Sequence, residues 1–158
     1  GRVLAGSAAN VIAEDGVLEG TVRTTSPEVR EQILSGFDRI IRGMAQLHGA
    51  EIELDLEEGY PPLINTDRET EVARRAALRV AGPENVVRDE HPSMGSEDFS
   101  YYLQQLPGAY VRIGSRGPGD EPLALHSPTF TIDEEALKVG AAFFDAAARE
   151  AIDEYSGE

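Results

Sequence analysis

A single histidine at a predicted strand-to-helix junction is the residue of this chain most able to do chemistry. His126 follows the glycine-containing loop 115–120 and precedes Pro128. Sites in open α/β sheets lie where strands end in loops, so we expect the imidazole to face a cleft. A neutral imidazole there suits zinc or manganese, although it can equally do no more than hydrogen-bond its own loop. The sequence therefore offers one candidate metal ligand and not a complete metal site.

A second candidate is the segment at residues 94–99, which carries Gly95, Ser96, Glu97 and Asp98 directly before a short predicted helix. Free backbone N–H groups at a helix start can receive a carboxylate or a carbonyl. The two acidic side chains can instead complement the helix dipole, or steady a ligand histidine through a hydrogen bond. The residues alone leave these alternatives open.

Asn10 and Arg23 lie on the two arms of a predicted hairpin. If the register is favourable, both side chains reach one surface and can grip a substrate carboxylate, because arginine offers the paired donors that such a group prefers. The alternative for each residue is an ordinary polar position on a strand.

Pro61 and Pro62 divide the elements that must position these residues into two predicted domains, residues 1–62 and 63–158. A diproline cannot join a central ladder and favours an extended connector, so we place the junction there. Residues 1–62 predict an open α+β layer. In chain order it contains two strands of a hairpin, a serine-capped helix ended by glycine, and a third strand, at residues 3–12, 17–24, 26–49 and 52–56.

Residues 63–158 alternate helix and strand patterns, and the fold class that we predict is α/β. Thr66 and Glu69 have the spacing of a capping box at the start of the first helix, which Gly82 ends. A strand, a short helix and a strand follow at residues 85–88, 99–106 and 109–114. The last helix, residues 133–155, carries one apolar stripe, made of Leu137, Ala141, Phe144, Ala148, Ile152 and Tyr155.

The composition excludes several partners. The 158 residues include 14 Lys and Arg against 29 Asp and Glu, a net charge of -15, which disfavours nucleic acid and anionic membranes. There is no cysteine, so disulfides and thiolate metal ligands are excluded. No apolar run approaches the length of a membrane span and no secretory leader pattern is present, so we expect a cytoplasmic protein.

Six segments occur in the order found in the metal-dependent N-acyl-amino-acid amidohydrolases, and the chain resembles this family over essentially its whole length. The family includes aminoacylases, hippurate hydrolases and the plant hydrolases of indole-acetyl-amino-acid conjugates. The two most specific segments carry Gly95 and His126. All six lie at residues 6–12, 20–23, 60–62, 94–99, 107–108 and 125–130.

The resemblance implies a metallopeptidase-like enzyme of which this chain is a C-terminal part. His126 matches the last metal ligand of a centre that holds two divalent ions, zinc or manganese, in the complete enzyme. The other ligands and the glutamate that takes a proton from water lie in sequence not contained here. No catalytic residue is therefore expected in this chain, which we expect to be inactive alone.

The resemblance also implies roles for the two predicted domains. Residues 1–62 match part of a lid that mediates homodimerisation, and residues 63–158 match the end of the catalytic domain. Asn10 and Arg23 match residues that hold the carboxylate of a small-molecule substrate, an N-acyl amino acid or related conjugate. Gly95 and Ser96 match the wall of the substrate pocket.

A function from another class is a non-catalytic α+β interaction module that pairs across subunits through a sheet edge or a helix face. Self-association of residues 1–62 would favour it. Under either interpretation an interrupted lid leaves apolar surface uncovered, so we expect the chain alone to be weakly stable or to self-associate.

The acidic excess predicts a protein adapted to high salt. Carboxylates are spread along the whole chain, and Lys138 is its only lysine. Because salt screens the mutual repulsion of these charges, we expect the melting temperature to rise as salt is increased from about 0.1 M to about 1 M. Thermal unfolding followed by circular dichroism across that series measures the effect. A melting temperature that is independent of salt would exclude this adaptation.

Overall fold

Helices make up most of the regular structure, and the sheet found among the described residues has two strands. The computed structural model describes residues 1–119, 121 and 123–157. The chain forms two compact units. The first comprises Gly1–Pro62 with Ser93–Gly95, and the second comprises Leu63–Pro92 with the chain from Ser96 onward. This mixture of helices with a small sheet agrees with the predicted α/β class at a coarse level.

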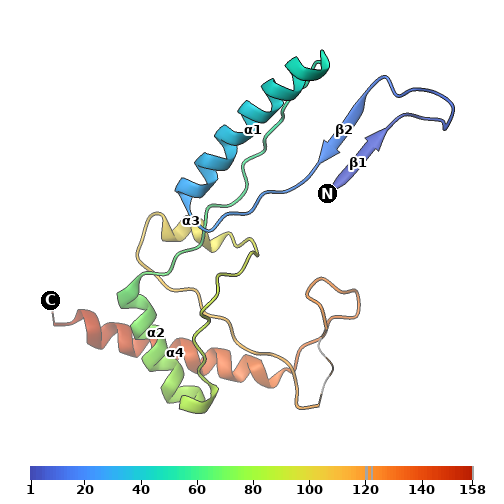
Figure 1. Cartoon of the computed structure of the whole chain (residues 1–158). Helices are drawn as coiled ribbons and strands as arrows, with labels where there is room; N and C mark the ends of the chain where they lie inside the picture. The colour runs from blue at the N-terminus through green and yellow to red at the C-terminus, as the bar shows by residue number, and fades with distance from the viewer. Residues whose placement is uncertain (120, 122, 158) are drawn as a thin grey trace. The chain divides into compact units, whose positions relative to one another are not determined.

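The first unit begins with a short antiparallel hairpin (Figure 1). Strand β1, Arg2–Ala5, pairs with β2, Gly16–Glu19, in a register that sets Arg2 opposite Glu19 and Ala5 opposite Gly16. The guanidinium of Arg2 binds the Glu19 carboxylate across the ladder at 2.6 Å. Both strands are exposed on both faces, so the hairpin is held by its own hydrogen bonds and this cross-strand pair.

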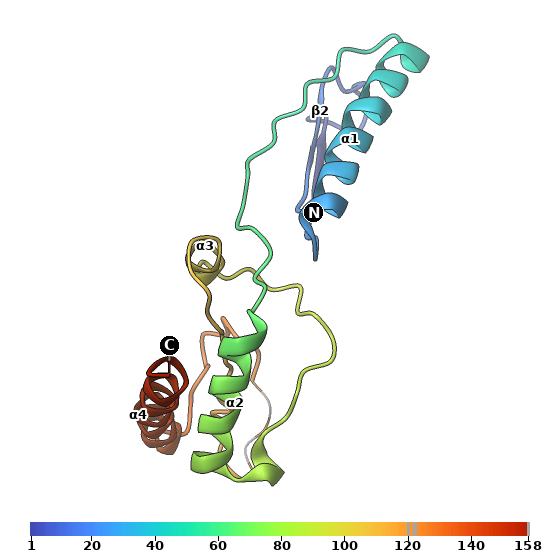
Figure 2. The ribbon, with the colours of Figure 1, turned by 90° about the vertical axis from the view of Figure 1, so that its left-hand side faces the viewer.

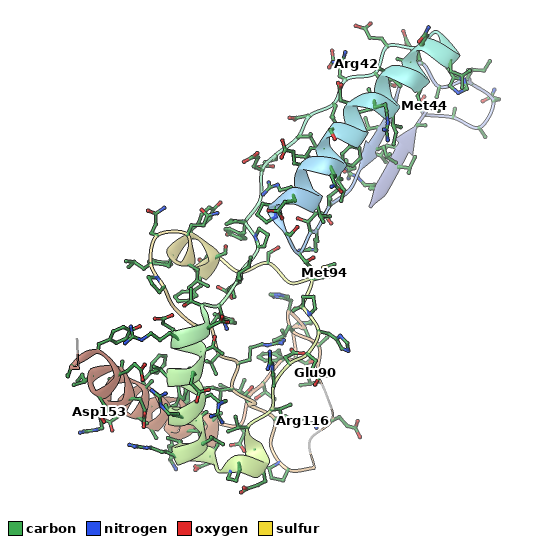
Figure 3. All side chains as sticks on the ribbon, turned by 60° about the vertical axis from the view of Figure 1, so that its left-hand side comes forward. Arg42, Met44, Glu90, Met94, Arg116 and Asp153 are labelled. Atoms are coloured by element: carbon green, nitrogen blue, oxygen red, sulfur yellow. The ribbon has the colours of Figure 1, made fainter. Side chains whose placement is uncertain are left out.

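Helix α1, Pro27–His48, has the predicted start and end. The Ser26 hydroxyl accepts a hydrogen bond from the Val29 N–H at 3.3 Å, and Gly49 ends the helix in the left-handed conformation, at φ 60°. None of its residues is buried; Leu47, for example, is 73% exposed. Figure 3 shows side chains projecting along the whole helix, with Arg42 and Met44 labelled. The apolar residues of α1 are therefore only partly covered in the described unit: Ile33, Phe37 and Ile41 are half-buried, whereas others, such as Ile40 and Leu47, are exposed.

The second unit is organised by two crossing helices, α2, Asp67–Ala81, and α4, Glu135–Tyr155 (Figures 1 and 2). A short 3-10 helix, η1, Pro83–Asn85, follows α2, and the five-residue helix α3, Phe99–Leu103, lies between them in sequence. Small side chains at the crossing let the two backbones approach closely. The core there consists of Phe143 surrounded by Ala73, Ala76, Ala77, Val80, Ala146 and Ala147.

A network of ion pairs between α2 and α4 lies at the edge of this crossing. The Glu150 carboxylate, only 6% exposed, accepts hydrogen bonds from Arg75 and Arg79, each at 2.9 Å. Arg75 and Arg68 also bind Glu154, at 2.7 and 3.2 Å. A carboxylate that leaves water needs such partners, because an unpaired buried charge is costly. The network therefore fixes which face of α4 meets α2.

That face is not the apolar stripe predicted from the sequence. The predicted stripe forms on one side of α4 but is exposed, with Phe144 at 72% and Ile152 at 63%. The buried residues are instead Phe143, Ala146 and Glu150. α4 is apolar on two sides, and the side that also carries Glu150 packs on α2 because α2 presents the matching arginines.

Three predicted strands are absent from the described residues, which corrects the assignments at 52–56, 85–88 and 109–114. The first runs as an extended, unpaired trace in Figure 1. The predicted hairpin arms also stop early, because β1 ends at Ala5 and Ile12 is 95% exposed. A two-residue period identifies a segment that can pair, but a strand also needs a neighbour to complete its hydrogen bonds.

We expect acid to weaken the pairing of α2 with α4. Hydrogen bonds from Arg75 and Arg68 hold the pKa of Glu154 below its ordinary value of 4.5. A carboxyl whose folded pKa is depressed adds stability that is complete above its unfolded pKa and is lost as the pH falls through its folded pKa. Urea unfolding of the whole chain, followed by circular dichroism at about pH 7 and about pH 4, measures this loss.

The substitution Glu154→Gln should shrink the difference between the two pH values. Asp153→Asn removes the same charge from an exposed neighbour, labelled in Figure 3, and is the matched control. The comparison cancels the general relief of acidic repulsion at low pH, which both variants share. An equal pH dependence in the two variants would contradict the prediction.

Candidate functional site

His126 sits in an unusual backbone conformation. Its φ is 69°, and it is the one residue other than glycine with a positive φ in the part of the chain that the structure describes. The Ser127 N–H donates to the Ala124 carbonyl at 3.1 Å, closing a turn around Leu125 and His126. A residue with a Cβ is strained in the left-handed region, and such strain concentrates at functional sites.

A second turn holds the histidine from the other side. The Phe130 N–H donates to the Ser127 carbonyl at 3.0 Å, with Pro128 at the position where its fixed φ suits a turn. The Ser127 hydroxyl accepts from the Thr129 N–H at 3.2 Å. His126 is exposed, so its imidazole is open to a ligand while its backbone is fixed by local bonds.

The long loop before His126 is closed at its base. The Asp133 N–H donates to the Ser115 carbonyl at 2.8 Å, which joins the two ends of the connection that carries the histidine. The predicted loop at 115–120 includes Asp120, which lies outside the described residues.

The segment at 94–99 does not offer the free helix-start donors that the sequence predicted. The Phe99 N–H donates to the Glu97 carboxylate at 3.3 Å, the Ser100 N–H to the Glu97 carbonyl at 3.3 Å, and the Tyr101 N–H to the Asp98 carbonyl at 3.0 Å. Just before them, the Gly95 N–H donates to the Ser93 hydroxyl at 3.2 Å. These donors are used internally, because the segment folds on itself.

The hairpin register separates Asn10 from Arg23. Asn10 lies in the loop beyond the Ala5 and Gly16 pair, whereas Arg23 follows β2 beyond the opposite end, where Arg2 faces Glu19. The four paired residues are separated by three steps of about 3.4 Å, so the ladder is about 10 Å long. The hairpin alone therefore does not bring the two side chains to one point, and a shared grip on a substrate would need another element.

The five predicted site residues are divided between the two units. Asn10, Arg23 and Gly95 belong to the first unit, and Ser96 and His126 to the second, so joint binding by all five stays a prediction. Among residues 1–119, 121 and 123–157 no three histidine, aspartate or glutamate side chains gather as a metal centre would require. The metal-ligand role of His126 therefore stays a prediction.

Sequence reasoning missed two residues that organise this region. Asn65 binds the backbone of Tyr110, and the Tyr110 hydroxyl binds Glu97. Asn65 stands beside a predicted helix cap and Tyr110 within a predicted strand, so a structural role was visible for each. Nothing in the spacing connected them, because the two residues are 45 positions apart.

None of the helices in the described part of the chain combines the length and apolar character that crossing a bilayer requires.

Comparison with known proteins shows similarity to a family of peptidases and to several hydrolases. The peptidase family M20/M25/M40 matches residues 4–150. The chain is 35% identical over 153 residues to the N-acetyl-L-cysteine deacetylase of Bacillus subtilis, covering 97% of this chain and 35% of that protein. It is 30% identical over 138 residues to thermostable carboxypeptidase 1 of Saccharolobus solfataricus, covering 86% of this chain and 34% of the relative.

A solved structure supports the same relationship. The YxeP protein of Bacillus subtilis, described as a dinuclear metal binding peptidase from the M20 family, superposes with a TM-score of 0.78 at 34% identity. The match covers 98% of this chain and 41% of that one. The chain spans between 34% and 38% of the first four curated relatives that it matches. This chain therefore belongs to the peptidase family M20/M25/M40.

Proposed function

We propose that this chain is part of a metal-dependent hydrolase that cleaves the amide bond of N-acyl amino acids or related conjugates. The family match over residues 4–150 carries the proposal. One relative is a deacetylase of an N-acetyl amino acid, which is the same class of bond. Because the chain spans little more than a third of such relatives, we propose that it forms the active hydrolase only together with further polypeptide.

His126 is the metal ligand that we propose within this chain. Its imidazole is exposed, and two turns hold its backbone in a left-handed conformation that an ordinary loop residue would avoid. Zinc or manganese suits an imidazole ligand. YxeP is described as dinuclear, which supports two ions in the complete enzyme. When bound, these ions supply Lewis acidity at the acyl carbonyl.

The remaining candidates bind substrate in this proposal. Arg23 offers paired donors to the substrate carboxylate, and Asn10 offers an amide from the hairpin loop. Gly95 and Ser96 line the pocket wall that receives the small molecule. This chain holds and orients the substrate, and we assign the proton transfers to residues that it does not contain.

We assign the first predicted domain, residues 1–62, to part of a lid that mediates homodimerisation, and residues 63–158 to the end of the catalytic domain. The uncovered apolar residues of α1 support a partner for the lid, because no residue of that helix is buried. A non-catalytic interaction module remains the alternative function, and the deacetylase relative favours the enzyme.

Two substitutions of His126 test whether the turn is strained. His126→Gly and His126→Ala both remove the imidazole, but only glycine adopts a positive φ without penalty. We expect the glycine variant to be the more stable, by about 1 kcal/mol, in urea unfolding of the whole chain. At Ala124, whose φ is not positive, the substitution Ala124→Gly should lower stability instead. A glycine variant less stable than the alanine variant would show that His126 is unstrained.

A zinc titration tests the ligand role. The polypeptide would join this chain to the N-terminal segments of the N-acetyl-L-cysteine deacetylase, and calorimetry would measure the affinity. We expect His126→Ala to weaken zinc binding at one site by about 100-fold, because one imidazole ligand is lost. His91→Ala removes another exposed histidine and should leave the affinity unchanged. If His126→Ala bound zinc as tightly as the unsubstituted protein, the ligand assignment would be wrong.

A further inference from the structure

Asn65 and Thr66, at the start of α2, form hydrogen bonds to the backbone of Tyr110 and Gly108. The Asn65 amide donates to the Tyr110 carbonyl at 3.0 Å, and its carbonyl oxygen accepts from the Tyr110 N–H at 2.8 Å. One asparagine side chain thus imitates a neighbouring strand. Thr66 does the same at Gly108: its N–H donates to the Gly108 carbonyl at 3.0 Å, and its hydroxyl accepts from the Gly108 N–H at 2.9 Å.

Thr66 therefore does not cap α2 in the predicted way. Its hydroxyl binds the Glu69 carboxylate and the Gly108 carbonyl, and makes no capping bond to an N–H of the helix. The consequence is that Gly108 and Tyr110 are fixed to the start of α2 by the side chain of Asn65 and by both the backbone N–H and the side chain of Thr66.

Helix α3 packs directly on this segment. The rings of Phe99 and Tyr110 lie 6.0 Å apart between centroids, and those of Phe99 and Tyr102 lie 5.7 Å apart. A Cβ at Gly108 would come within 2.8 Å of the end of the Leu103 side chain, so α3 lies close to this backbone and a larger residue would require that side chain to shift. The α3 segment is thereby seated against residues that α2 already holds.

Glu97 joins the two parts. Its carboxylate accepts a hydrogen bond from the Phe99 N–H at 3.3 Å, and its interaction with the Tyr110 hydroxyl shifts the pKa of both groups. Its carbonyl accepts from the Ser100 hydroxyl at 2.7 Å, and Ser100 is fully buried. The side chain and the backbone of Glu97 are both engaged, so the residue fixes the backbone that immediately follows Ser96.

The acidity of the pair agrees with this arrangement. The hydrogen bond from Tyr110 lowers the pKa of Glu97, and the same bond, with some burial, raises the pKa of Tyr110 above 10.0. Asp98 and Arg112 also face Tyr110, with opposite charges. Glu97 is therefore held as a carboxylate that accepts hydrogen bonds, which is the form that this anchoring role requires.

We propose that Glu97 is a positioning residue of the hydrolase, which sets the placement of Ser96 toward the substrate through its bonds to Tyr110 and Phe99. The inference rests on the proposed function, because Ser96 enters as part of the substrate pocket. Glu97 acts through Ser96 and touches neither substrate nor metal in this role. Neutralising the dipole of α3 is a weaker explanation, because that helix has only five residues and the carboxylate is already bonded to Tyr110.

Hydrogen exchange of the whole chain tests the anchor itself. We expect Glu97→Ala and Tyr110→Phe to speed exchange of the Phe99 amide by about tenfold, because each loses a bond that orders the segment. Glu97→Gln keeps an acceptor and should preserve most of the protection. Glu90→Gln removes a charge from an exposed position labelled in Figure 3 and is the control. Unchanged exchange in both Glu97→Ala and Tyr110→Phe would overturn the anchor.

Kinetics of the joined polypeptide with zinc and an N-acetyl amino acid test the consequence. We expect Glu97→Ala to raise KM about tenfold with kcat within about threefold, and Glu97→Gln to restore KM to within about twofold. An equal fall of kcat in both variants would indicate a catalytic carboxylate and overturn the positioning role. Hydrolysis with an unchanged KM in Glu97→Ala would overturn this inference alone. No hydrolysis by the unsubstituted polypeptide would overturn the proposed function, and this inference with it.

Discussion

The contact between α2 and α4 is the interaction on which the second unit depends. The alanines of α2 let Phe143 reach the crossing, and Arg75 and Arg79 satisfy the buried Glu150 carboxylate. The chain between these two helices carries both Ser96 and His126. Because α2 and α4 are held together, the chain between them forms a closed loop. Closing the loop lowers the conformational entropy of that chain. The ordering of Ser96 and His126 therefore depends on a helix crossing that contains neither residue.

Helices were predictable from this sequence because their signals are local. Ser26, Pro27 and Gly49 act within a turn of the helix that they bound, and α1 follows them closely. Strands were predictable only in part. The hairpin forms, with shorter arms than predicted, but the segment 52–56 forms no strand, because a pairing pattern says nothing about where the partner is. The same limit applied to α4, whose buried face was decided by arginines on α2 that lie far away in sequence.

The sequence names candidate site residues, whose roles stay predictions, but it does not give their geometry. The loop before His126 and the proline after it mark this residue in the sequence. No sequence pattern, however, predicts a φ of 69° at a histidine. Glu97 was noticed with the dipole of α3 as one explanation, whereas its carboxylate binds the Phe99 N–H and interacts with Tyr110, whose backbone is held by Asn65, 45 positions from Tyr110. The hairpin register, which places Asn10 and Arg23 at opposite ends, likewise depends on where the ladder stops rather than on the alternation of residues.

Two loops of the second unit are held by local hydrogen bonds, with no paired strand beside them among the described residues. Residues 108–110 have no neighbouring strand among the described residues, and Asn65 and Thr66 supply side-chain hydrogen bonds in its place. The turn at His126 is closed by the backbone of Ala124 and Ser127, again without a sheet. Local bonds of this kind persist whether or not further strands are added. In the proposed hydrolase, the further polypeptide would meet a His126 turn and a Ser96 segment whose backbones are already fixed, which lowers the entropy lost on assembly.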